Sequence, residues 1–166
     1  MLNEVYNILL KEYGKQGWWP LNGIYSGKVP EKDEVFEVCL GAILTQNTAW
    51  INVEKALKNL NGKCVKSLSD EELAPLIKPA GYYNQKVKKI RALIKFLDSG
   101  AVVSRETLLD IWGIGPETAD SILLYAFGKP FFVVDSYTKR IFSRVGLCEK
   151  NCSYDSVLGL VSSLPK

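Results

Sequence analysis

The chain has 166 residues, 47% of them hydrophobic and 23% charged, which fits one domain or two small lobes and excludes a disordered or fibrous chain. The net charge of +3 permits an anionic partner, and the lack of histidine excludes histidine-based triads, general bases and zinc sites. No apolar stretch approaches the ~20 residues of a membrane span and the first residues do not resemble a signal peptide, so we expect a cytoplasmic protein.

Apolar residues recur with helical spacing along most of the chain. The predicted helices span 31–44, 48–60, 70–77, 84–97, 104–111, 116–127, 135–145 and 153–164. From Val35 onward the first helix is apolar almost all round, which predicts burial on every side. The only strand-like run is 131–134, so the predicted fold class is all-α.

Two groups of residues leave alternatives open. The basic residues of helix 84–97 form either a DNA-facing surface or a solvated face: Lys86, Lys88, Lys89, Arg91 and Lys95. The cysteines are predicted to be free, buried thiols, because their spacing does not suit an all-cysteine metal site: Cys39, Cys64, Cys148 and Cys152. No metal is therefore expected.

The segment 108–128 predicts two helices joined by Gly113-Ile114-Gly115. The glycines allow a tight turn with positive φ, and Ile114 can fill the space between the helices. The free amides at the start of the second helix, behind Pro116, suit a phosphate because the helix dipole is positive there. This arrangement is typical of a helix-hairpin-helix that holds a DNA backbone without reading its sequence. An ordinary helix–glycine–helix corner explains the hairpin residues equally well.

The residues after the hairpin favour DNA binding. A Gly/Pro segment at 128–130 precedes Asp135, and in this order the chain resembles the helix-hairpin-helix DNA glycosylases of the endonuclease III superfamily. Residues 41–48 resemble the family segment whose glutamine enters the gap left by the flipped base, and residues 81–86 resemble its wedge loop. The resemblance runs from about residue 30 to the C-terminus and implies these DNA contacts: Gln46, Tyr82, Gly113, Ile114, Gly115 and Thr118.

One position separates the branches of this family. Bifunctional members carry a lysine two residues after the second hairpin glycine, where it forms a Schiff base with the sugar and cuts the strand. Glu117 stands there, and a carboxylate cannot form an imine. Residues 113–120 and the Trp18-Trp19-Pro20 run are similar to the 3-methyladenine DNA glycosylase III branch. That similarity implies an alkylpurine pocket of Trp18, Trp19 and Trp50 with Glu117 beside it; the alternative for the tandem tryptophans is a core anchor.

The resemblance implies that Asp135 is the catalytic residue. As the base leaves, the sugar becomes oxocarbenium-like, and a nearby carboxylate stabilises that charge and orients water. Asp135 is also a predicted N-cap, worth ~1 kcal/mol, and both roles can hold at once. A 3-methyladenine carries a formal positive charge, so its glycosidic bond is already weak and a π-rich pocket attracts it.

The predicted fold is a two-lobe helix-hairpin-helix DNA glycosylase fold. Residues 1–28 with 129–166 form one lobe, which carries Asp135, and residues 29–128 form the other. Family members normally continue beyond the point that corresponds to residue 166, so we expect a C-terminally shortened lobe. Many members also hold a four-cysteine iron–sulfur cluster, but the cysteine spacing in this sequence does not suit one, so we expect no cofactor. The expected function is monofunctional removal of alkylated purines from double-stranded DNA by a monomer at the nucleoid. The alternatives are a uracil or thymine mismatch glycosylase and a non-catalytic DNA-binding module.

Overall fold

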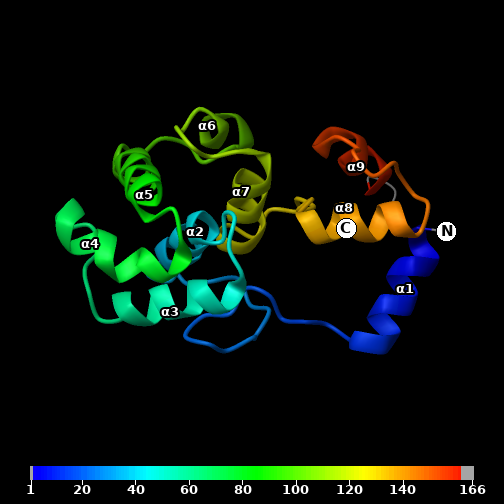
Figure 1. Cartoon of the computed structure of the whole chain (residues 1–166), viewed down its shortest axis with the longest axis horizontal. Helices are drawn as coiled ribbons and strands as arrows, with labels where there is room; N and C mark the ends of the chain where they lie inside the picture. Colours follow the sequence, from blue (N-terminus) through cyan, green and yellow to red (C-terminus); the bar gives the residue numbers. More distant parts are fainter. Residues whose placement is uncertain (1, 162–166) are drawn as a thin grey trace.

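The computed structural model describes residues 2–161, which form two groups of helices (Figure 1). The larger group contains α2 (Val35–Leu44), α3 (Trp50–Leu60), α4 (Asp70–Ile77), η1 (Lys78–Ala80), α5 (Tyr83–Asp98), α6 (Arg105–Leu109), α7 (Pro116–Ser121) and η2 (Ile122–Ala126). The smaller group contains α1 (Leu2–Tyr13), α8 (Ser136–Arg144) and α9 (Tyr154–Val161). The chain crosses between the groups twice, after α1 and after η2, so the smaller group combines both ends of the described chain.

The main core surrounds α2. Seven consecutive residues of this helix, 38–44, are buried, which confirms the prediction of a helix enclosed on every side. Helices α3, α5 and α7 and the η2 turn all pack against it. Each fully buried Leu, Ile or Val side chain contributes roughly 1.5–3 kcal/mol, so α2 is the main apolar anchor of the larger group.

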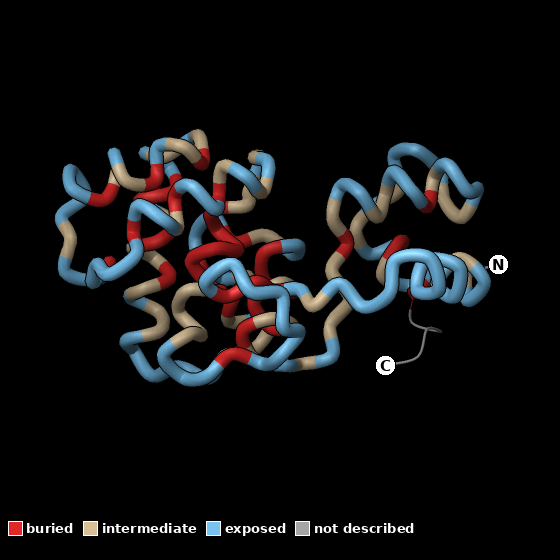
Figure 2. Tube along the Cα trace, turned by 90° about the horizontal axis from the view of Figure 1, so that it is seen from below, coloured by how far each residue is buried: buried red, intermediate tan, exposed pale blue. Residues whose placement is uncertain are grey.

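The smaller group has a core of its own, made of Val134, Phe142, Val157 and Val161. Figure 2 shows that buried residues concentrate in the larger group and are sparse in the smaller one. Helix α1 has no buried residue, and its Ile8 is 65% exposed. The position of Asp135, between Val134 and α8, therefore depends on a small core and on its ties to the larger group.

The structure corrects several predicted element bounds. Residues 31–34 form a turn in which the Glu34 carboxylate accepts a hydrogen bond from the Glu31 amide, so α2 begins only at Val35. The predicted helix 116–127 changes at Ile122 into the π-helical turn η2. Residues 131–134 form no strand, and within residues 2–161 the β-structure is limited to an isolated bridge between Leu21 and Ile24. The predicted end of the last helix, 162–164, lies outside the described residues.

The helix ends follow local capping rules. Ser69 and Ser104 each accept a hydrogen bond from the third backbone amide of the helix that follows, in α4 and α6. This confirms the predicted cap at Ser104. None of the helices between residues 2 and 161 combines the length and apolar character needed to cross a membrane.

Candidate active site and DNA interface

The hairpin between α6 and α7 requires glycine at one of its two glycine positions. Gly113 has φ of +83°, and a Cβ placed there would lie 2.6–2.8 Å from three side-chain carbons of Lys89. Ile114 is only 6% exposed and fills the space between the helices, as predicted. Gly115 instead has φ of −99° with open space around it, so the expected positive φ is wrong there. Gly115 precedes α7 as its N-cap, and that place favours extended backbone.

The amides at the start of α7 are free to bind an anion. The Ile114 amide donates to the Ile111 carbonyl and is therefore used inside the hairpin. The amides of Gly115, Glu117 and Thr118 have no acceptor within residues 2–161. Together with the positive end of the helix dipole, these donors provide the chemistry for holding a phosphate.

Gln46 links the α2–α3 turn to the hairpin. Its Nε2 donates to the Gly113 carbonyl at 3.1 Å and to Thr118 Oγ1 at 2.9 Å. Its Oε1 accepts from Lys89 Nζ at 2.5 Å. The Thr118 side chain is buried, and its hydroxyl oxygen is the acceptor that holds the Gln46 amide in place. Three segments that are distant in sequence meet at this one amide.

Lys86 corrects the expectation for the basic residues of α5. It is 2% exposed, and its Nζ donates to the carbonyls of Leu44 at 2.8 Å and Ala80 at 2.7 Å. Burial, helped by the charge of Lys89, lowers the pKa of Lys86 to about 8. Lys86 thus fixes the end of α2, two residues before Gln46, and is neither a solvated nor a DNA-facing lysine.

Tyr82 has the exposure that a wedge needs. It is 69% exposed and holds a left-handed backbone with φ of 46° at the start of α5. Tyr82 and Gln46 line the same small polar cavity of about 230 Å³, with Lys89 on its wall. The structure therefore brings two of the predicted DNA contacts together on one side of the larger group.

Five aromatic rings, Tyr25 beside Trp18 among them, form a cluster between the N-terminal segment and the larger group. The ring centroids of Trp18 and Trp50 are 4.7 Å apart, and those of Trp19 and Trp50 are 5.3 Å apart. Tyr125 of η2 joins them at 5.5 Å from Trp19, a contact that no sequence pattern indicated. Trp19 is 5% exposed and packs in the main core, whereas Trp18 is 36% exposed. The core-anchor interpretation therefore describes Trp19, and Trp18 presents an accessible ring.

The cluster holds two unpaired donors. The indole nitrogens of Trp19 and Trp50 are buried, and within the described part of the chain neither has a hydrogen-bond partner. A buried donor without a partner costs about 1–3 kcal/mol.

Asp135 caps α8, as predicted. Its Oδ1 accepts from the Thr138 amide at 2.7 Å and from Thr138 Oγ1 at 2.8 Å. No protein group within residues 2–161 hydrogen-bonds to Oδ2. The cap therefore occupies one carboxylate oxygen and leaves the other for chemistry.

Asp135 is electrostatically connected to two neighbours. Partial burial, and then the Asp135 charge, raise the pKa values of Glu117 and Tyr125. Lys139 of α8 opposes the shift in the pKa of Glu117. Tyr125 belongs to the aromatic cluster, so the charge of Asp135 acts on both the hairpin helix and this cluster. Sequence reasoning found Asp135 and Glu117 but not Tyr125 of η2 or Lys139 of α8.

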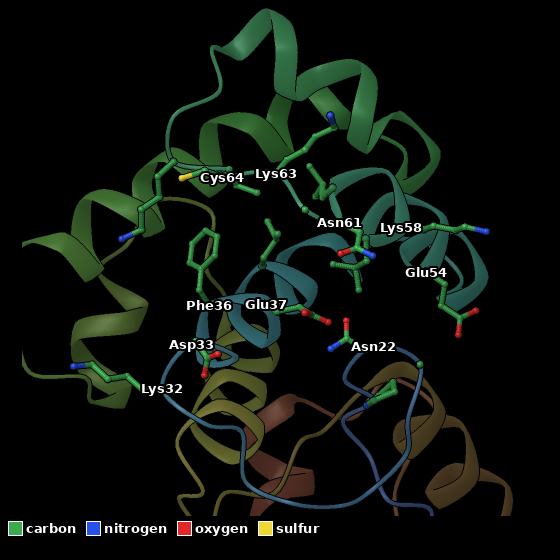
Figure 3. Close-up of a pocket in the computed structure, with 18 of the residues that line it drawn as sticks. Asn22, Lys32, Asp33, Phe36, Glu37, Glu54, Lys58, Asn61, Lys63 and Cys64 are labelled. Carbon is green, nitrogen blue, oxygen red and sulfur yellow. The ribbon is translucent and has the colours of Figure 1, made fainter.

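A larger cavity lies elsewhere. It has a volume of about 760 Å³ beside α2 and α3, and Figure 3 shows Phe36, Glu37, Lys63 and Cys64 around it. Trp50 of the aromatic cluster lines it, whereas Asp135 and Glu117 do not. Cys64 is exposed there, contrary to the expectation of buried thiols.

The other cysteines differ among themselves. Cys39 is buried, and burial raises its pKa to about 12. The Sγ atoms of Cys148 and Cys152 lie 2.7 Å apart and are half-buried. Among the residues that the structure describes, no group of three or more Cys, Asp or Glu side chains is arranged to hold a metal ion.

The all-α architecture, the hairpin and the neighbouring carboxylates define a helix-hairpin-helix protein of DNA repair. Residues 40–165 match the model of the HhH-GPD superfamily base excision DNA repair protein, and the chain belongs to that family. This confirms the resemblance to the endonuclease III superfamily, so the protein is a DNA-binding glycosylase of base excision repair.

Two relatives show the breadth of the similarity. A protein of Methanocaldococcus jannaschii, provisionally named as a DNA repair glycosylase, is 40% identical over 186 aligned positions that cover 100% of this chain and 80% of the relative. Endonuclease III of Thermotoga maritima is 30% identical over 145 residues, covering 82% of this chain and 68% of the relative.

Solved structures agree with this assignment. H. pylori 3-methyladenine DNA glycosylase (MagIII), bound to 1,N6-ethenoadenine, superposes with a TM-score of 0.73 at 32% identity, covering 95% of this chain and 77% of that one. An endonuclease III–DNA complex gives a TM-score of 0.81 at 22% identity and shows the shared fold.

Proposed function

We propose that this protein hydrolyses the N-glycosidic bond of alkylated purines such as 3-methyladenine, leaving an abasic site in an uncut strand. The observation that carries the proposal is the aromatic cluster together with the half-capped Asp135, whose charge acts on Glu117 of the hairpin helix and on Tyr125 of the cluster. The 32% identity with a protein named as a 3-methyladenine DNA glycosylase supports the same substrate class.

The aromatic cluster supplies recognition of a charged base. A cationic ring gains ~0.5–2 kcal/mol from each π face it contacts, a gain that neutral adenine lacks. Trp18 presents the accessible ring, with Trp19 and Trp50 packed around it. An alkylated base also pairs weakly, which lowers the cost of flipping it out of the duplex.

Asp135 supplies the catalytic charge. Its unpaired Oδ2 is available to stabilise the oxocarbenium-like sugar and to orient the attacking water. Because the alkylated base leaves as a neutral group from a cationic precursor, it requires no strong acid. We therefore include no metal, iron–sulfur cluster or other cofactor in the proposal.

The proposal excludes strand cleavage because the position of the Schiff-base lysine holds Glu117. Lys139 is the amine that influences the Glu117 carboxylate and is thus the one to test for residual lyase chemistry. We propose that the hairpin amides bind a DNA phosphate and that Gln46 contacts the base left without its partner. Tyr82 is proposed to act as the wedge in the duplex. One chain is expected to act as a monomer on chromosomal DNA in the cytoplasm.

The proposal is tested by measuring base release and strand integrity together on methylated duplex DNA. We expect free 3-methyladenine, intact strands, and no covalent adduct after borohydride treatment. Asp135→Asn keeps an N-cap acceptor and removes the charge, so base release should fall at least ~100-fold while the melting temperature stays near that of the parent.

Three other outcomes would contradict the proposal in different ways. Release at the parent rate by Asp135→Asn removes the catalytic assignment. A borohydride adduct that disappears in Lys139→Met shows lyase activity from an unexpected lysine. Release of uracil or mismatched thymine, without 3-methyladenine, indicates a mismatch glycosylase, and DNA binding without release of any base indicates a binding module.

A further inference from the structure

Asp120 is a buried ionisable residue of the hairpin motif that the proposed function does not use. Its side chain is fully buried in α7. Arg105 donates from Nε to Oδ1 at 2.8 Å and from Nη2 to Oδ2 at 3.4 Å. Tyr154 donates its hydroxyl to the same Oδ2 at 2.6 Å. The buried carboxylate is thus the centre of a three-residue network.

This network connects the two groups of helices. Asp120 and Arg105 belong to the larger group, whereas Tyr154 is the first residue of α9 in the smaller one. The Tyr154 ring packs against the small core, and its oxygen accepts a hydrogen bond from the Val134 amide at 3.4 Å. Val134 immediately precedes Asp135. A single hydroxyl therefore joins the hairpin helix to the residue before the catalytic carboxylate.

We infer that Asp120 and Tyr154 are positioning residues that hold the Val134–Asp135 segment against the hairpin helix. The inference rests on the proposed function, in which Asp135 acts on the sugar while the hairpin holds the DNA backbone. The hairpin fixes the DNA relative to α7, and Asp120 fixes α9 and Val134 relative to the same helix. The distance from the DNA backbone to the Asp135 carboxylate is then set by the connection from α7 through Asp120 and Tyr154 to Val134.

The charges of the network suit this role. Burial and the hydrogen bond to Asp120 raise the pKa of Tyr154, which keeps its hydroxyl protonated as a donor. The hydrogen bond to Asp120 raises the pKa of Arg105, so the guanidinium stays charged. A hydrogen bond to an ionised acceptor is roughly twice as strong as a neutral one. Position matters because a displacement of ~1 Å at a catalytic group can cost about 100-fold in rate.

The decisive variant is Tyr154→Phe, which keeps the ring in the small core and removes both hydrogen bonds. Asp120 itself is less useful, because removing one member of a buried ion pair strongly destabilises a fold. Tyr13→Phe is the matched control: it removes a hydroxyl from α1 of the same group, at a residue that is 67% exposed.

Single-turnover base release and DNA affinity are measured for the parent, Tyr154→Phe, Asp135→Asn and the double variant. We expect Tyr154→Phe to slow release ~10- to 100-fold with DNA affinity changed less than ~3-fold, and Tyr13→Phe to change neither. In the Asp135→Asn background, Tyr154→Phe should cause no further loss, because it acts through Asp135. The exchange of the Val134 amide with solvent should accelerate at least ~10-fold in Tyr154→Phe.

The inference and the proposed function fail in different ways. Equal slowing of release by Tyr154→Phe with and without the Asp135 carboxylate overturns the inference, as does a Val134 amide that exchanges at the parent rate. A parent protein that releases no alkylated base refutes the proposed function. The Val134 exchange measurement, which needs no substrate, still decides in that case whether Asp120 and Tyr154 hold the segment.

Discussion

The two hairpin glycines should respond differently to alanine, although the sequence presents them as equivalent. In Gly113→Ala the new residue must adopt φ of +83°, which costs a non-glycine residue ~1–2 kcal/mol. Its Cβ would also meet the Lys89 side chain at 2.6–2.8 Å. Displacing that side chain breaks the hydrogen bond from Lys89 Nζ to Gln46 Oε1, a charged bond worth about 1.5–3 kcal/mol.

These effects sum to a loss of roughly 2–4 kcal/mol for Gly113→Ala, allowing for some relaxation of Lys89. For a chain of this size the loss corresponds to a fall of roughly 4–16 °C in melting temperature. Gly115→Ala should stay within ~0.5 kcal/mol of the parent, since its φ of −99° suits alanine and nothing lies within 4 Å of the new Cβ. Any loss of DNA affinity in Gly115→Ala therefore reports on the phosphate site alone.

The assay is urea unfolding followed by tryptophan fluorescence, without DNA. The double variant Gly113→Ala/Lys89→Ala separates the steric part from the backbone part, because it removes the side chain that the new Cβ would meet. The reasoning is refuted if Gly113→Ala unfolds at the same urea concentration as the parent, or if Gly115→Ala is destabilised as much as Gly113→Ala.

Three further predictions concern the groups around this hairpin. Lys86→Met leaves the Leu44 and Ala80 carbonyls without their buried donor and should lower the free energy of unfolding by about 1–3 kcal/mol. The control Lys88→Met, on the same helix, should change it little. Equal effects of the two variants in urea unfolding would contradict the burial of Lys86. The pKa of Glu117 is raised above its ordinary 4.5, so folding favours the protonated form and stability falls as pH rises through the folded pKa. Glu117→Gln should therefore melt at a higher temperature than the parent at pH 7. A difference in melting temperature that persists below pH 4.5 would argue against this cause. A double-mutant cycle of Lys89→Met with Gln46→Met should give a coupling of about 1.5–3 kcal/mol in unfolding free energy. A coupling as small as that of Lys88→Met with Gln46→Met would show that the Lys89–Gln46 hydrogen bond adds nothing.

Much of the architecture follows from local patterns in the sequence. The apolar run after Val35 determines a buried helix, and Ser104 and Asp135 determine where helices begin. Gly113 and Pro116 determine the hairpin turn. These features depend on side-chain periodicity and on hydrogen bonds that reach only three or four residues along the chain, which is why they can be predicted without a structure.

The tertiary structure alone decided which of these elements act together. The Gln46 side chain meets Thr118 across 72 residues, and Tyr154 meets Asp120 across 34. The burial of Lys86 was equally invisible, because its helical position looks solvated until the ends of α2 and η1 present their carbonyls to it. The helical face on which a residue lies, and its charge, can be predicted from the sequence. Its hydrogen-bond partners depend on how separate helices pack, and that packing is determined by the core as a whole.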